Sequence, residues 1–186
     1  MLVINFHPFP NLKTERLQLR PIENSDVKEV FALRSNPSTM KFIPRPLLKN
    51  DEEALEHIAV INSKIDNNEG INWAITLKGN PKLIGIIGHF RIEPQNYRAE
   101  IGYMILPEYH GQGIVAEAIK EVVRYGFEEM NLHSIEAIID PNNLASEHVL
   151  QKNGFIKEAH ILENEFFDGK FIDTVIYSLL KRNFQN

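Results

Sequence analysis

Residues 99–116 constrain the fold more than any other part of the chain, because they join a predicted strand to a predicted helix through a turn with two glycines. The segment reads AEIGYMILPEYHGQGIVA, with Gly111 and Gly113 in the turn. Glycine permits backbone conformations that other residues avoid, and the first turn of a helix leaves several N–H groups unpaired. The segment therefore predicts an anion-binding turn, with an ordinary strand-to-helix connection as the alternative. It lacks the GxGxxG and GK[ST] spacings of nucleotide-binding motifs.

The rest of the chain predicts a mixture of strands and helices, without an internal repeat or a Gly-, Ser- or Pro-rich linker. Apolar runs separated by turn signals predict three antiparallel strands over 71–77, 83–92 and 99–106. Apolar residues at helical spacing predict a long helix from Ile114 to Met130. The other predicted elements are a strand over 13–20, two helices before residue 62, a strand over 135–139, a helix over 144–152 and a terminal hairpin around Asp168 and Gly169.

Composition narrows the classes of protein that the chain can represent. Its 186 residues suit one domain, and we expect a single domain over 1–186 with its core over about 14–181. There is no cysteine, which excludes a disulfide framework, thiolate metal sites and a cysteine nucleophile. The net charge is −5 and no basic block occurs, so we expect no nucleic-acid partner. The seven histidines show no paired metal-ligand spacing, so we expect no metal.

The chain also shows no sign of a membrane segment. No apolar run approaches the roughly 18 residues that a membrane span requires. Residues 1–9 are apolar, but no Lys or Arg precedes them and Pro8 interrupts them, which argues against a signal peptide. We therefore expect a cytoplasmic protein without a membrane partner.

Four motifs together resemble the GNAT acetyltransferase superfamily, and within it the Rim-type branch of ribosomal-protein N-acetyltransferases. They are TERLQLR at 14–20, PEYHGQGIVAEAI at 107–119, DPNNLASEHVLQKNGF at 140–155 and DGKFID at 168–173. Each is loose alone, but their order and spacing are specific. The resemblance implies an α/β (α+β) fold with a mixed, mainly antiparallel sheet of six to seven strands, a V-shaped splay and about four flanking helices. It also implies acetyl-CoA as the co-substrate.

The resemblance assigns cofactor contacts to two stretches of this chain and to the helix after residue 143. The family's Q/RxxGxG/A pattern, which binds the CoA phosphates, falls on 110–115, with His110 in place of Gln or Arg and Val115 in place of a small residue. Lys152 is expected near the adenine end. The complete expected set is Met104, Ile105 and Leu106 along the pantetheine arm, His110, Gly111, Gln112, Gly113, Ile114, Val115 and Ala116 around the phosphates, and Asn143, Ser146 and Lys152.

Acetyl transfer to an amine needs a base, a stabilised oxyanion and a proton for the departing thiolate. With no cysteine and no GxSxG motif, direct attack in a ternary complex is the simpler mechanism. The family implies a backbone N–H near Ile105 for the oxyanion and suggests Ser146 as the general acid. The alternative is that Asn143 only caps a helix and Ser146 is an ordinary first-turn residue.

Glu165 matches a glutamate that looks like the branch's proposed base. Its neighbours Phe166 and Phe167 would raise its pKa by desolvation, which suits a base near neutral pH. A solvated charge on a strand is the alternative interpretation. Glu100 is the second candidate, and it would otherwise pair with Arg98 or order a water.

The predicted function is acetyl-CoA-dependent N-acetylation of a primary amine, first of all a protein N-terminus. A small amine such as a polyamine, an amino acid or an aminoglycoside is the alternative acceptor, and a non-catalytic acyl-CoA-binding module is the alternative class. Trp73, Phe42 and Pro44 would line the acceptor pocket or belong to the core. A homodimer through the terminal hairpin is a further expectation.

Overall fold

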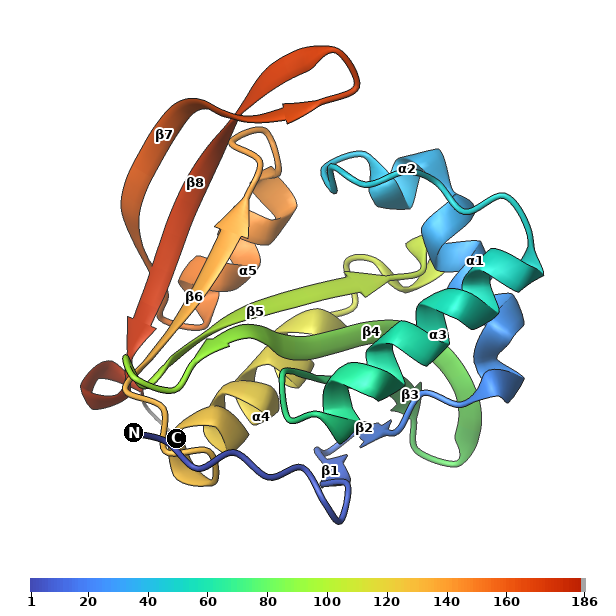
Figure 1. The fold of residues 1–186 in the computed structure, drawn as a ribbon, viewed down its shortest axis with the longest axis horizontal. Coiled ribbons are helices and arrows are strands. Elements are labelled where there is room, and N and C mark those ends of the chain that lie inside the picture. Colours follow the sequence, from blue (N-terminus) through green and yellow to red (C-terminus); the bar gives the residue numbers. More distant parts are fainter. Residues whose placement is uncertain (185–186) are drawn as a thin grey trace.

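The computed structural model describes residues 1–184, within which eight strands form one sheet with helices around it (Figure 1). The strands are β1 (Leu12–Lys13), β2 (Leu17–Arg20), β3 (Ile71–Leu77), β4 (Asn80–Glu93), β5 (Arg98–Ile105), β6 (Ser134–Ile139), β7 (Ile156–Phe167) and β8 (Lys170–Leu180). The α-helices are α1 (Val27–Ser35), α2 (Pro37–Met40), α3 (Asp51–Asp66), α4 (Ile114–Glu128) and α5 (Leu144–Lys152).

The strand order in the sheet is β1-β2-β3-β4-β5-β6-β8-β7. All neighbouring strands are antiparallel except β5 and β6, which are parallel. This is the predicted mixed, mainly antiparallel sheet, and the fold class is confirmed. The strand count is higher than the expected six to seven because the predicted strand over 13–20 is divided into β1 and β2, which pair with each other. The fifth helix is α2, a single turn capped by Asn36.

The core lies between the sheet and the helices that cover it. One face of α4 is buried along its whole length, through Ile114, Ala118, Ile119, Val122, Val123 and Phe127. Trp73 of β3 is fully buried, its ring packs edge-on against Tyr125 of α4 at 5.3 Å between centroids, and its Nε1 donates a hydrogen bond to Pro10 O at 2.6 Å. Trp73 therefore belongs to the core, which is one of the two roles predicted for it.

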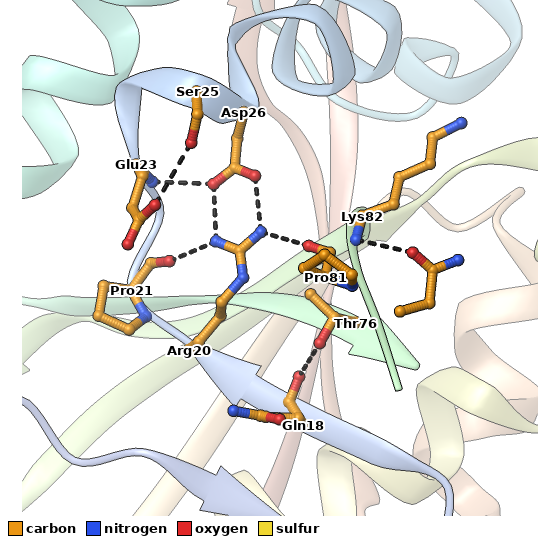
Figure 2. A network of polar contacts seen from close by, with 10 residues as sticks. Gln18, Arg20, Pro21, Glu23, Ser25, Asp26, Thr76, Pro81 and Lys82 are labelled. Carbon is orange, nitrogen blue, oxygen red and sulfur yellow. Dashed lines mark hydrogen bonds and ion pairs between the residues drawn. The ribbon is translucent and has the colours of Figure 1, made fainter. Parts of the chain in front are cut away.

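A polar network fixes the connection from β2 to α1 (Figure 2). Arg20 donates two hydrogen bonds to the buried Asp26 carboxylate, at 2.8 and 2.7 Å, and one to Pro81 O at the start of β4 at 2.6 Å. Asp26 also accepts the Glu23 N–H at 2.8 Å. Such a paired, hydrogen-bonded ion pair is the form in which buried charge is tolerated. The second arginine of the TERLQLR motif thus has a structural role.

Candidate functional site

The sheet opens between β5 and β6, in the V shape that Figure 1 shows. The two parallel strands pair only from Arg98 to Glu100, opposite Ser134 to Glu136. Beyond these three pairs β5 continues to Ile105 beside β4 alone, while β6 continues beside β8. One edge of residues 101–105 consequently has no strand partner among residues 1–184. An unpaired edge of this kind can take an extended ligand as an added strand.

The backbone direction at the end of β5 shows which groups face this opening. The Leu106 N–H points to β4, where it bonds Ile84 O at 2.9 Å. Successive residues of a strand direct their N–H and C=O groups to opposite edges, so those of Ile105 face the opening. His110 Nε2 lies 3.3 Å from Ile105 O. The Ile105 N–H therefore faces the opening, and it is the group for which the oxyanion role is predicted. The backbone groups of Met104 and Leu106 face β4.

The glycine turn lies between β5 and α4. Gly111 and Gly113 have φ of 72° and 73°, and Gly113 is the residue immediately before α4. Within residues 1–184, the backbone N–H groups of 111–116 have no hydrogen-bond acceptor. A Cβ at Gly111 would meet nothing within 4 Å. The turn thus offers several free donors at the positive end of a helix, which is the geometry that favours a phosphate.

A hollow of about 490 Å³ lies beside the turn. Its lining includes Gly113, Ala116 and Lys152 from the predicted set, together with Arg16 and Lys120, which the sequence analysis did not select. Lys120 and Lys152 form no ion pair with any of residues 1–184. Lys120 follows Gly113 and Ala116 at helical spacing, and this spacing is the signal that would have identified it.

Asn143 begins α5, as the alternative interpretation held. Its Oδ1 accepts the Ser146 N–H at 3.1 Å. The Ser146 hydroxyl lies beside Tyr103 of β5. Burial raises the pKa of the Tyr103 phenol to about 12, and the interaction with Ser146 opposes this rise. Tyr103 Oη is buried and forms no well-aligned hydrogen bond within the described chain, so it is a neutral donor next to Ser146 that the sequence analysis missed.

Glu165 lies on β7, near the tip of the β7–β8 hairpin. Its carboxylate is 3.3 Å from the Arg45 guanidinium, in the loop between α2 and α3, and its side chain is 34% exposed. Figure 1 shows this hairpin reaching over the opening toward α2. Of the two phenylalanines expected to enclose Glu165, Phe166 does not do so, because it is 62% exposed and packs against Phe171 at 5.0 Å between ring centroids.

Glu100 lies on β5 in the last parallel pair, at the point where the strands separate. It is only 5% exposed, and Arg91 donates a hydrogen bond to its carboxylate at 2.7 Å. Burial raises the pKa of Glu100 to about 7, although Arg91 lowers it. Pairing with Arg98, one of the two alternatives predicted for Glu100, does not occur, because Arg98 pairs with Glu136 instead. Glu100 therefore combines burial, a position at the opening and a pKa suited to proton transfer near neutral pH.

Residues 1–184 contain neither a metal-binding cluster of side chains nor a membrane-spanning helix. No group of three or more His, Asp or Glu side chains is arranged to hold a metal ion. No helix in this range has the length and the apolar character needed to cross a membrane.

The splayed sheet and the free strand edge that leads into a glycine turn define the class of protein, an acetyltransferase with the GNAT fold. The chain belongs to the GNAT acetyltransferase family, since the family model described as "Acetyltransferase (GNAT) domain" matches residues 16–156. The resemblance seen in the sequence is confirmed at this level.

Three similar proteins show the range of the relatives. The uncharacterized N-acetyltransferase YoaA of Bacillus subtilis is 35% identical over 173 residues, covering 93% of this chain and 98% of YoaA. YdaF of Bacillus subtilis, named as a proposed ribosomal N-acetyltransferase, is 34% identical over 116 residues, or 62% of each chain. The crystal structure of spermidine N-acetyltransferase from Vibrio cholerae, in complex with CoA and spermine, has a TM-score of 0.81 at 25% identity, covering 93% of this chain and 100% of that chain. The chain is thus an N-acetyltransferase of the GNAT family.

Proposed function

We propose that the chain transfers acetyl from acetyl-CoA to a primary amine by direct attack in a ternary complex, and that a protein N-terminus is its first class of acceptor. The observation that carries this proposal is the free edge of β5, which runs from the buried Glu100 at the opening to the glycine turn before α4. Along this edge, these features would supply a site for proton transfer, a strand edge that can pair with the pantetheine arm, and N–H donors for the phosphates. A single domain in the cytoplasm, acting as a homodimer, completes the proposal.

The donor site follows this line from the turn to the opening. The free N–H groups of 111–116 would hold the pyrophosphate, and Lys120 and Lys152 would contact phosphate from the hollow. The pantetheine arm would pair with the unpaired edge of β5 at Ile105, flanked by Met104 and Leu106. Asn143 would contact the arm with its amide nitrogen, because its oxygen already caps α5.

The reaction needs no covalent intermediate with the protein. The acceptor nitrogen attacks the thioester carbonyl carbon, the new C–N bond forms, and the C–S bond breaks as the thiolate leaves. The Ile105 N–H would donate to the developing oxyanion, a role in which one donor is commonly worth about 10² to 10³ in rate. Ser146 would give its proton to the thiolate, with the Tyr103 phenol beside it.

Two carboxylates are candidates for the base that accepts the amine proton. Glu165 is the candidate from the family pattern, and Glu100 is the candidate favoured by burial and by its pKa of about 7. The pH dependence of kcat/KM in Glu100→Gln and Glu165→Gln separates them. The acidic limb of the profile should disappear in the variant that lacks the base and persist in the other. Loss of the limb in neither variant would reject both assignments.

The acceptor would enter between the α2–α3 loop and the β7–β8 hairpin, where Arg45 and Glu165 meet. The relatives named for ribosomal proteins and for spermidine support a peptide and a polyamine, respectively. A panel of N-terminal peptides, polyamines and amino acids, each assayed for acetylation by mass spectrometry, tests the choice. The proposal predicts the highest kcat/KM with a peptide N-terminus, and a higher value with a polyamine would replace the proposed acceptor.

A further inference from the structure

Glu117, in the first turn of α4, is held by the segment that leads into β2. Its carboxylate accepts hydrogen bonds from the Thr14 hydroxyl, from the Arg16 N–H at 2.9 Å and from Arg16 Nε at 2.6 Å. Arg16 Nη1 also donates to Gln112 O in the glycine turn, at 3.0 Å. Arg16 thus contacts both the start of α4 and the turn before it, although it lies about a hundred residues away from them in the sequence.

Two other contacts hold the glycine turn: Gln112 Nε2 donates to Glu108 O at 2.9 Å, and Gly113 O accepts the Glu117 N–H at 3.1 Å. Neither of them fixes the Gln112–Gly113 peptide unit directly. Within residues 1–184, no backbone hydrogen bond is donated by Gly111, Gln112 or Gly113. The nearest atom to a Cβ at Gly113 would be Arg16 Nη2, at 3.6 Å. Because the peptide unit is planar and trans, its C=O and N–H point in opposite directions. Holding Gln112 O on the Arg16 side therefore also sets the direction of the Gly113 N–H, at a glycine whose backbone could otherwise rotate.

Arg16 also settles the charge of Glu117. The Glu117 side chain is only 19% exposed. Burial would raise the pKa of Glu117, but the hydrogen bonds from Thr14 and Arg16 outweigh burial and lower the pKa below its ordinary value. Glu117 therefore carries a negative charge, and it directly follows residues 111–116, whose free N–H groups would receive the phosphate. Without Arg16, its negative charge would stand unpaired next to that site and repel an anionic ligand.

We propose that Arg16 is a positioning residue for the donor site: it orients the Gln112–Gly113 peptide and neutralises Glu117, so that the turn is ready to bind the CoA phosphates. This inference rests on the proposed function, because it assumes CoA as the ligand. It gives the first arginine of the TERLQLR motif a role distinct from that of Arg20, whose partners lie in the network of Figure 2.

The test is a double-mutant cycle with CoA as the probe and calorimetry as the measurement. Arg16→Ala should raise the Kd for CoA about ten- to hundredfold, since a hydrogen bond to a charged group is commonly worth about 1.5 to 3 kcal/mol. It should raise the KM for acetyl-CoA while kcat at saturation stays within about twofold. Arg16→Lys should recover only part of the loss, because lysine lacks the guanidinium fork.

Glu117→Gln supplies the decisive comparison, because its effect on the affinity for CoA should have opposite signs in the wild-type and Arg16→Ala backgrounds. In the wild-type background it should weaken CoA binding by loosening the contact with Arg16. In the Arg16→Ala background it should strengthen binding by removing the unpaired charge. An effect of the same sign in both backgrounds would overturn the proposal and favour direct contact of Arg16 with phosphate.

Arg20→Ala is the matched control, since it removes the other arginine of the TERLQLR motif, which also holds a carboxylate by two hydrogen bonds. It should lower the melting temperature but leave the Kd for CoA unchanged. Wild-type protein that fails to bind CoA would reject the proposed function itself. Wild-type protein that binds CoA, together with an Arg16→Ala variant of equal affinity, would reject only this inference.

Discussion

Glu100 shows how one residue can connect the stability of the fold with its chemistry. It is buried where β5 and β6 separate, and burial raises its pKa to about 7. In the unfolded chain a glutamate has a pKa of about 4.3. Between these two values the folded protein binds one more proton at Glu100 than the unfolded protein does. The free energy of unfolding that Glu100 contributes is therefore fully present below about pH 4 and is lost as the pH rises through 7.

Glu100→Gln should remove this loss, because glutamine stays neutral. The difference in free energy of unfolding between Glu100→Gln and wild type should increase from pH 5 to pH 8 by about 2 to 3 kcal/mol. Urea unfolding at both pH values measures it. The comparison must be between variants, because burial lowers the pKa of His89 to about 4 and gives wild type an opposite trend below pH 6.5. A pH-independent difference would contradict the burial of an ionisable Glu100.

Residue pairings were the hardest feature to predict from the sequence. Pairing of Glu100 with Arg98 was one of two predicted alternatives, but Arg91 is the residue that donates to its carboxylate. The β4–β5 register shifts after Phe90, and Arg91 has a positive φ of 46°. An irregularity of this kind redirects a side chain, and the pattern of residue types does not predict it. The contact of Arg16 with Glu117 was missed for a similar reason, since only the folded sheet brings β2 beside α4.

At the scale of elements, the glycine turn before α4 is the part that sequence reasoning located best. The predicted order of strands over 71–106, the long helix after it and the terminal hairpin all match the structure, because their apolar periodicity and turn residues are strong local signals. The opening of the sheet was expected only from the family resemblance. The parallel β5–β6 pairing that creates it joins distant segments, and periodicity within a segment carries no information about such pairing.

Gly113→Ala tests the element that this turn forms. A residue with a Cβ at φ 73° carries a conformational penalty of about 1 to 2 kcal/mol, and relief of that strain would move the N–H groups at the start of α4. We expect a lower melting temperature and a Kd for CoA raised by at least about tenfold. Differential scanning fluorimetry and calorimetry measure the two effects.

Gly79→Ala is the control for this prediction, because Gly79 has φ 79° in the β3–β4 turn and no neighbouring atom within 4 Å of a Cβ. It should show a comparable loss of stability with unchanged CoA affinity. Equal affinity in Gly113→Ala and Gly79→Ala would contradict the assignment of phosphate to the turn before α4.

At the scale of the whole molecule, the donor and the protein carry charge of the same sign. The net charge of the chain is −5, so CoA binding must depend on local features: the helix start, the free amides, and Lys120 and Lys152, which form no ion pair within residues 1–184. The same acidic surface suits a cationic amine as acceptor. The two substrates would then be recognised at opposite ends of one opening in the sheet.

The central claim, direct acetyl transfer from acetyl-CoA to an amine, is tested most directly by the release of free thiol. The chain contains no cysteine, so a thiol reagent reports only the CoA that the reaction liberates. We predict thiol release that depends on both enzyme and amine, saturates with acetyl-CoA and matches the acetylated amine mole for mole. Binding of acetyl-CoA without amine-dependent thiol release, across N-terminal peptides, polyamines and amino acids, would contradict the account and support a non-catalytic acyl-CoA-binding module.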